Sequence, residues 1–285
     1  AGRLVARGDA IAIEGMAARA GEGTLDLGGT LRPLAPGMPL ALTLAAREAT
    51  LALGDRATVR LSADLRLDGE AAGALAATGR IDVARAEILL PERLPADVVD
   101  LPVRVAGEAP PAPTPETTSP VALDIAVDAP RAVFVRGRGV DAELGGSVRL
   151  GGTAATPDIT GAFALRRGEI SILAQRIAFR RGALDFDGAA GIDPALDFEA
   201  ATTAGDITAL VRVGGTATAP SITLASEPEV PQDEVLARLL FGRSQATLTP
   251  VQLLQLAQAA AELTGVGPSG PGILDQVRRR LGLDR

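Results

Sequence analysis

Histidine, cysteine, lysine, tryptophan and tyrosine occur nowhere in the 285 residues, so all 28 basic side chains are arginine. Without histidine or cysteine the chain cannot form a Ser-His-Asp triad, an imidazole base, a thiol nucleophile or a zinc finger. Without lysine it cannot form a Schiff base or a P-loop. Only carboxylates, hydroxyls and arginine remain for chemistry, so we expect a protein that is not an enzyme and that holds no metal or cofactor.

The chain also has little that would direct it to nucleic acid or hold it in a membrane. Its net charge of −7 disfavours nucleic acid, because that binding depends on neutralising phosphates. No apolar run approaches the ~20 residues of a membrane-spanning helix, and the first residues lack the apolar core of a signal peptide. Since there is no initiating methionine, we interpret the chain as a fragment whose export signal or membrane anchor lies outside it.

What the sequence does contain is alternation of apolar and polar residues. Hydrophobic residues make up 47% of the chain and aromatic residues only 2%, so the apolar side chains are mostly aliphatic. Residues 57–67, ATVRLSADLRL, alternate without a break, which is typical of a half-buried strand. Similar segments occur at 40–44, 101–105, 121–127, 169–172, 176–180, 184–187, 196–199 and 207–213. Short strands with turn residues between them predict an antiparallel or meandering sheet rather than βαβ units.

Two kinds of near-repeat accompany these strands. GGTAATPDIT at 151–160 returns as GGTATAPSIT at 214–223, which predicts a strand end, a proline turn and a new strand. Arg-Gly or Arg-Ala pairs at 85–86, 167–168 and 181–182 predict strand starts. Such units cannot bury an apolar face alone, so we expect stacked units that share a continuous one.

The alternation of apolar and polar residues stops at two places, and these places divide the chain into its predicted parts. Residues 107–120 are rich in proline and lack apolar periodicity, which predicts a disordered loop. We expect this loop to be an insertion in one elongated sheet formed by 1–106 and 121–226, although a linker between two domains is the alternative. Residues 227–285 are predicted to be helical.

Three short helices are expected in that last segment. The first carries Asp233 and Glu234 in its first turn and ends at Gly242. The second begins at Thr249, an N-cap residue followed by proline, and ends at Gly265. The third spans 272–281, where Arg278–Arg280 form either a solvated helix end or a contact for anionic headgroups.

The apolar face of such a sheet needs a cover. Periodicity alone favours a closed sandwich, barrel or β-helix. However, the helices are too few to cover about fifteen strands, which would extend roughly 70 Å at ~4.8 Å per strand. The lining also lacks the large aromatic residues that usually anchor sandwich cores. Both features indicate an elongated, bent sheet with an open aliphatic groove, which would suit acyl chains.

Three motifs resemble the C-terminal domain of the TamB family: SILAQRIAF at 171–179, GALDFDG at 182–188, and PQDEVLARLLFGR at 231–243. The resemblance covers about the last 120 residues closely, and the first 150 only in style. It implies a long bent β-sheet with an apolar groove, in a protein that is anchored in the inner membrane and crosses the periplasm of a diderm bacterium. It also implies phospholipid as the cargo, the outer-membrane barrel protein TamA as a partner, and a role in outer-membrane assembly.

The resemblance favours a groove over a sealed core and assigns candidate residues to it. The predicted lining consists of Ile170, Ile172, Ile177, Phe179, Leu184, Phe186, Leu196, Phe198, Ile207 and Val211. The predicted capping or partner-binding helix presents Val235, Leu236, Leu239, Leu240 and Phe241. A helix that caps the open end of the sheet and a helix that plugs it or binds a partner are compatible alternatives.

Three further patterns give only weak evidence of a functional site. Asp185, Asp187 and Asp193 suggest calcium, but they lack EF-hand spacing, so we favour solubilising residues at strand edges. Asp197 and Glu199 share one face of a strand, where a solvated surface is favoured over acid-base chemistry. GRGVDA at 137–142 matches a dinucleotide motif formally, but the glycines that follow it leave no room for the required helix.

Four functions compete at this point. The first is a conduit that carries phospholipid acyl chains. The second is a scaffold that pairs its sheet edges with nascent outer-membrane strands and works with TamA in assembly or secretion. The third is a closed β-solenoid with a structural role, and an enzyme is a distant fourth.

Overall fold

A computed structural model describes residues 2–54, 56–90, 121–172, 175–189 and 192–264, without the side chains of 172 and 258–264. The features predicted at 101–105, 107–120, 265 and 272–281 lie outside these residues.

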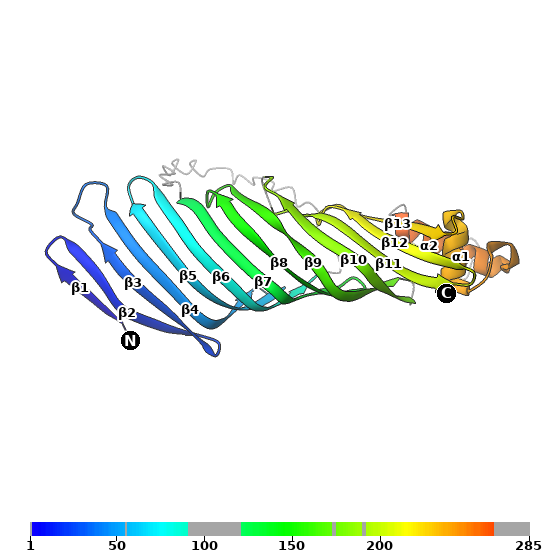
Figure 1. The fold of residues 1–285 in the computed structure, drawn as a ribbon, viewed down its shortest axis with the longest axis horizontal. Helices are drawn as coiled ribbons and strands as arrows, with labels where there is room; N and C mark the ends of the chain where they lie inside the picture. The colour runs from blue at the N-terminus through cyan, green and yellow to red at the C-terminus, as the bar shows by residue number, and fades with distance from the viewer. Residues whose placement is uncertain (1, 55, 91–120, 173–174, 190–191, 265–285) are drawn as a thin grey trace, which may run out of the picture.

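The strands form one 13-stranded sheet whose spatial order is the order of the chain (Figure 1). They are β1 Arg3–Arg7, β2 Ala10–Ala20, β3 Gly23–Leu31, β4 Pro39–Leu53, β5 Ala57–Glu70, β6 Leu75–Leu89, β7 Val121–Gly137, β8 Val140–Gly152, β9 Pro157–Ile172, β10 Gln175–Asp187, β11 Ala195–Ala204, β12 Ile207–Gly215 and β13 Pro220–Glu227. Helix α1 (Gln232–Phe241), the 3₁₀ turn η1 (Gln245–Thr247) and helix α2 (Pro250–Thr264) follow. The predicted mainly-β fold with a short helical segment is confirmed.

One pair of neighbours departs from the expected meander. β6 and β7 are parallel, with Leu75 beside Val121 and Leu89 beside Arg136, whereas the other neighbours are antiparallel. A parallel pair needs a long crossover rather than a hairpin, and the chain between these two strands is long enough for one. The strands on both sides of this interruption therefore belong to the same sheet.

The sheet has one apolar face and one charged face. Residues that pair across neighbouring strands lie on the same face, so the register traces each face from strand to strand. Leu42 pairs with Leu67, Leu67 with Ala77, and Ala77 with Leu123. Among the described residues, the register places no charged side chain on this apolar face, from β1 to β13.

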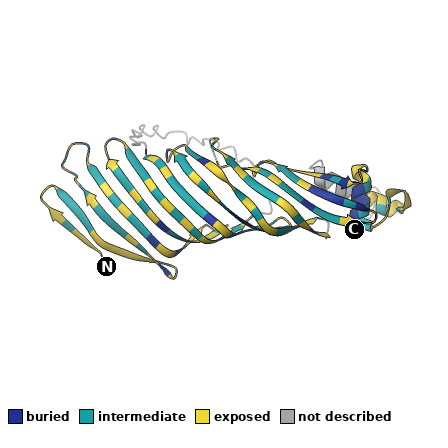
Figure 2. Ribbon diagram, in the orientation of Figure 1, coloured by how far each residue is buried: buried dark blue, intermediate teal, exposed yellow. Residues whose placement is uncertain are grey.

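The apolar face is concave. Several side chains on this face, most of them small, are almost fully buried, although α1 packs at the far end, against β13 and β11. These buried residues are Ala46, Ala49, Ala63, Ala86, Ala129 and Leu144. Since no helix or second sheet lies over them in the described part of the chain, the bend of the sheet itself buries them. Figure 2 shows that most of the sheet is otherwise exposed or half-buried.

The bend follows a line of β-bulges. Register shifts occur at Ala46/Ala49, Ala129/Val133 and Phe179/Arg181, and at corresponding places on other strands. A bulge adds one residue to a strand, bends the strand and increases its local twist. Where one residue is added, as in β4 and β10, the apolar positions also move from odd to even numbers or the reverse, so Phe179 and Leu184 keep the same face.

Two sequence interpretations are corrected by these bulges. Segments 176–180 and 184–187, predicted as separate strands, form the single strand β10. The Arg-Gly and Arg-Ala pairs at 85–86, 167–168 and 181–182 lie inside β6, β9 and β10, next to bulges, and do not start strands. The proline turns after both GGT motifs are confirmed, since β9 begins at Pro157 and β13 at Pro220.

Arginines stabilise the bulges from the charged side. Arg47 donates from Nη1 to the carbonyl oxygens of Ala46 (2.9 Å) and Ala63 (3.1 Å), and Arg166 donates to the carbonyl oxygen of Pro130 (3.0 Å). A bulge interrupts the strand ladder locally, and a carbonyl that lacks a partner is costly. The guanidinium groups therefore satisfy backbone oxygens along the bend.

The bulge in β7 gives a first prediction. Ala132 has a φ of 63° there, in the left-handed region that favours glycine. We expect Ala132→Gly to stabilise the protein by about 0.5–1 kcal/mol, because the substitution removes this steric cost. Urea unfolding measures the change. Ala129→Gly, in the same strand but without a positive φ, is the control and should destabilise; a loss of stability in both variants would contradict the argument.

Candidate functional site

The concave apolar face is the largest continuous feature of the described structure. Large aliphatic side chains on it remain open to solvent: Met16 is 37% exposed, Leu51 36% and Leu53 61%. A sealed core buries such residues almost completely. The face is therefore groove-like: it is open to solvent at β2 and β4, and its large side chains are half-buried along much of the other strands. Thirteen strands at ~4.8 Å per strand extend about 60 Å.

The residues predicted to line the groove share this face. Apart from Ile172, whose side chain lies outside the described part, the register places all of them on it. They fall into two groups. Phe179, Leu184, Phe186, Leu196 and Phe198 are half-buried, whereas Ile170, Ile177, Ile207 and Val211 are buried in a cluster that includes α1. That they contact lipid remains a prediction.

Two aromatic pairs lie on the open part of the groove. Phe179 and Phe198 meet edge to face at 5.5 Å, and Phe163 and Phe186 at 6.3 Å. Gly182 faces Phe198 across β10 and β11, and a Cβ there would lie 2.1 Å from the ring. Glycine at this position therefore leaves room for the ring, which a larger residue would displace. Sequence reasoning missed Phe163, although it alternates with Leu165 on the same face.

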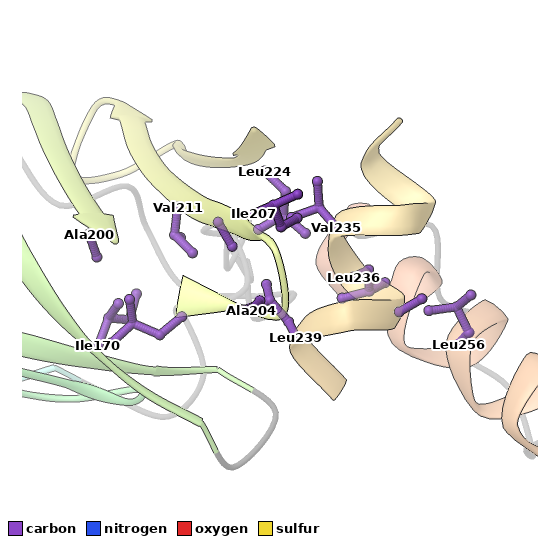
Figure 3. Close-up of a cluster of buried hydrophobic side chains, with 13 residues drawn as sticks. Ile170, Ala200, Ala204, Ile207, Val211, Leu224, Val235, Leu236, Leu239 and Leu256 are labelled. Carbon is purple, nitrogen blue, oxygen red and sulfur yellow. The ribbon is translucent and has the colours of Figure 1, made fainter. Parts of the chain in front are cut away.

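Helix α1 covers the groove at its C-terminal end (Figure 3). Val235, Leu236 and Leu239 are buried against side chains of the last strands, and Leu240 and Phe241 pack at the margin of the same cluster. The strand side chains in this cluster include Ala200, Ala204, Ile207, Ala209, Val211 and Leu224. The predicted helical stripe is thus present, and it faces the apolar side of the sheet.

The helix boundaries follow the sequence signals. Gly242 ends α1 in a left-handed conformation, and its N–H donates to the carbonyl oxygen of Arg238. Thr249 Oγ1 accepts a hydrogen bond from the Gln252 N–H at 3.4 Å, as an N-cap residue does, and Pro250 is the first residue of α2.

Polar contacts hold α1 in place. Arg238 forms an ion pair with Asp206 in the β11–β12 turn, and its Nε donates to Glu234 at 2.7 Å. Glu234 also accepts hydrogen bonds from the Gln245 N–H (2.8 Å) and the Ser244 hydroxyl (3.3 Å). Because Arg238 and Glu234 are mostly buried, these charge-assisted bonds fix the position of the helix more strongly than surface pairs would.

The opposite face carries ion pairs between neighbouring strands. Arg181 contacts Asp197 at 2.6 Å and Arg212 contacts Glu199 at 3.0 Å. Arg167 donates to Glu143 at 2.6 Å and lowers the pKa of that carboxyl. Asp197 and Glu199 are therefore partners of arginines on a charged surface.

A shallow pocket on this charged face lies over β5, β6 and β7. Its lining includes Arg56, Glu87, Phe134 and Arg136. The guanidinium carbons of Arg85 and Arg136 lie 4.5 Å and 5.1 Å from the centre of the Phe134 ring. These cation–π contacts hold the ring between arginines, so Phe134 is an aromatic residue on the side opposite the groove.

Asp193 has a structural role that the sequence did not reveal. Its carboxylate accepts hydrogen bonds from the N–H (2.8 Å) and the hydroxyl (2.6 Å) of Thr218, in the β12–β13 turn. Asp187 binds the N–H of Ala189 instead. Within the described residues, no group of three acidic side chains is placed to hold a metal ion. Asp193 therefore joins two turns.

This contact gives a pH prediction. Hydrogen bonds from Thr218, and then from Thr216, lower the pKa of Asp193. The ionised Asp193 carboxylate therefore stabilises the fold fully above the pKa of an unfolded aspartate, about 3.9. This stabilisation is lost as the pH falls through the lower pKa of Asp193 in the folded protein. We expect the protection factor of the Thr218 amide, which compares its exchange rate with the intrinsic rate at the same pH, to fall over that acidic range. Asp193→Ala should remove the pH step; a step that persists in the variant would contradict this assignment.

Fold and site together define a class of protein: an open, bent β-sheet whose apolar face forms a groove and whose other face is charged. The chain belongs to the TamB C-terminal domain family, whose family model matches residues 14–285. The match thus includes most of the first 150 residues as well as the last 120.

A relative of this chain carries the name of the same family. The translocation and assembly module subunit TamB of Haemophilus influenzae is 31% identical over 156 residues, which are 53% of this chain and 12% of that protein. The chain thus spans a small part of the length of this relative. In the described part of the chain, no helix combines the length and hydropathy needed to cross a bilayer.

Proposed function

We propose that the concave face binds the acyl chains of phospholipids and carries them along the sheet. The observation that carries this proposal is an apolar face that continues across all 13 strands without a charged residue in the described register, and that no second sheet covers in the described part of the chain, so that many of its large side chains are only half-buried. Exposed apolar surface of this extent marks an interaction site. The headgroups would remain in solvent at the rim.

The energetic reason is the cost of moving an acyl chain through water. Each buried CH₂ contributes ~0.8 kcal/mol, so a sixteen-carbon chain faces a barrier on the order of 12 kcal/mol without a cover. A continuous apolar groove removes most of this barrier at every step along the sheet. The groove acts by binding and not by catalysis.

The family supplies the setting of this proposal. We place the chain in the periplasm of a diderm bacterium, as one segment of a TamB-like protein that is anchored in the inner membrane and reaches the outer membrane. The partner at the outer membrane would be a TamA-like barrel protein. The charged face, with its ion pairs between strands, suits an aqueous compartment.

Photo-cross-linking tests lipid binding and its face. Benzoylphenylalanine at Phe186 and Phe198 is expected to form phospholipid adducts, because both residues lie on the open groove. Asp185 and Asp197 are the matched controls, since they precede these residues on the same strands and face the other side. Cross-links only within the protein, or lipid adducts on both faces, would contradict the proposal.

A second candidate is a scaffold for outer-membrane proteins. The observation in its favour is the open sheet, in which β1 and β13 each have a neighbouring strand on one side only within the described part. Such an edge can pair with an added strand. Cross-links from β1 or β13 to nascent outer-membrane chains, without lipid adducts in the groove, would favour this function.

A further inference from the structure

Helix α1 lies on the same apolar face that the proposed cargo would use. Ile207 and Val211, in β12, are 2% and 0% exposed beneath it. Val211 of β12 pairs with Ala200 of β11, and Ala200 pairs in turn with Phe179 of β10, a half-buried residue at the border of the open groove. The open and covered parts of the face are therefore one continuous surface. Over β11–β13, α1 covers this surface with apolar side chains, as an acyl chain would cover it on the other strands.

The contacts of α1 combine this apolar cover with a polar latch on one turn. Arg238 reaches Asp206, which is 82% exposed at the β11–β12 turn, and Glu234 is bonded to Arg238 and to the backbone beyond α1. On the other side, Ser226 anchors the segment that leads from β13 into α1, through hydrogen bonds with Pro228 and Val230. The helix is thus tied to the sheet at two separate points.

We infer that α1 is a releasable stopper that closes the C-terminal end of the groove and competes with lipid for β11–β13. The Arg238–Asp206 pair is the latch that holds it closed. The inference rests on the proposed function, because it concerns regulation of the same groove. A lipid that arrives along β10 meets α1 and advances only when the helix moves away, so displacement of α1 by a partner would release cargo at this end.

The test breaks the latch in the full chain and leaves the apolar contacts intact. Asp206→Asn removes the charge from an exposed turn residue, and Arg238→Gln removes its partner. Arg212→Gln is the matched control. It breaks the Arg212–Glu199 ion pair between β12 and β11, the strands on either side of the Asp206 turn, but this pair lies on the charged face, away from α1. Exchange of amide hydrogens in β4 and β5 reports whether each variant remains folded.

Two readouts follow. Exchange of α1 amide hydrogens should accelerate several-fold in both latch variants and stay unchanged in the control. With benzoylphenylalanine at Phe179, which packs against the α1 cluster, the ratio of lipid adducts to cross-links within the protein should rise several-fold. The same ratio at Phe186, which lies near the other end of β10 and outside the α1 cluster, should not change.

The outcomes separate this inference from the proposed function. Lipid adducts at Phe186, with an unchanged ratio at Phe179 in the latch variants, would overturn the stopper and leave the groove in place. Absence of lipid adducts at Phe186 in every protein would overturn the proposed function, and the stopper with it. If Arg238→Gln fails to fold, Asp206→Asn decides the question alone.

Discussion

Replacing Phe198 with aspartate is expected to lower the phospholipid bound by this chain at least about tenfold, which corresponds to ~1.4 kcal/mol. Phe198 lies half-buried on the open groove and meets Phe179 edge to face. A carboxylate at this point must stay hydrated, and burying it without a partner costs several times that energy. The continuous apolar path would be interrupted. Mass spectrometry of lipids that purify with the protein measures the effect.

The control is Thr203→Asp, which adds the same charge to the same strand on the exposed opposite face. It should leave lipid binding unchanged. Circular dichroism of both variants separates a loss of binding from a loss of fold. Equal lipid content in the two variants would mean that the concave face is not the binding surface.

The second large effect concerns the covered end. Leu236 is 2% exposed between α1 and the last strands. Leu236→Ala should destabilise the docking of α1 by about 2–4 kcal/mol, through the lost transfer energy and the cavity left behind. Exchange of α1 amide hydrogens measures this locally, and β4 amides should be unaffected because α1 does not pack there.

Leu254→Ala in α2 is the matched control, since Leu254 is 57% exposed. Its effect should stay below about 0.5 kcal/mol, as for most surface substitutions. Similar losses in both variants would show that α1 is not docked through Leu236.

Much of this architecture follows from local patterns in the sequence. Alternation predicts strands such as β5, and helix-capping residues locate α1 and α2 closely, because both signals are local. The concave face could be predicted only in part. Phe179 and Leu184 lie on the same face, yet their numbers differ in parity, so the pattern read as two strands instead of one bulged strand.

Other features depend on contacts between distant parts of the chain. The parallel pairing of β6 and β7 has no local signal, because it depends on how the chain returns after Leu89. The latch joins Arg238 to Asp206 across two elements, and Asp193 meets Thr218 from a separate turn. The small number of helices, the few aromatic residues and the family resemblance favoured an open groove, and the exposed leucines of β4, Leu51 and Leu53, support it.

The central claim is that acyl chains occupy the concave face, and the absence of tryptophan and tyrosine allows a direct test. Phe186→Trp places a single indole in the groove, and Phe134→Trp places one on the charged face as a matched control. With phospholipid carrying brominated acyl chains, fluorescence at position 186 should be strongly quenched and fluorescence at 134 should not. Equal quenching at both positions, or none at 186, would contradict the groove as the path of the lipid.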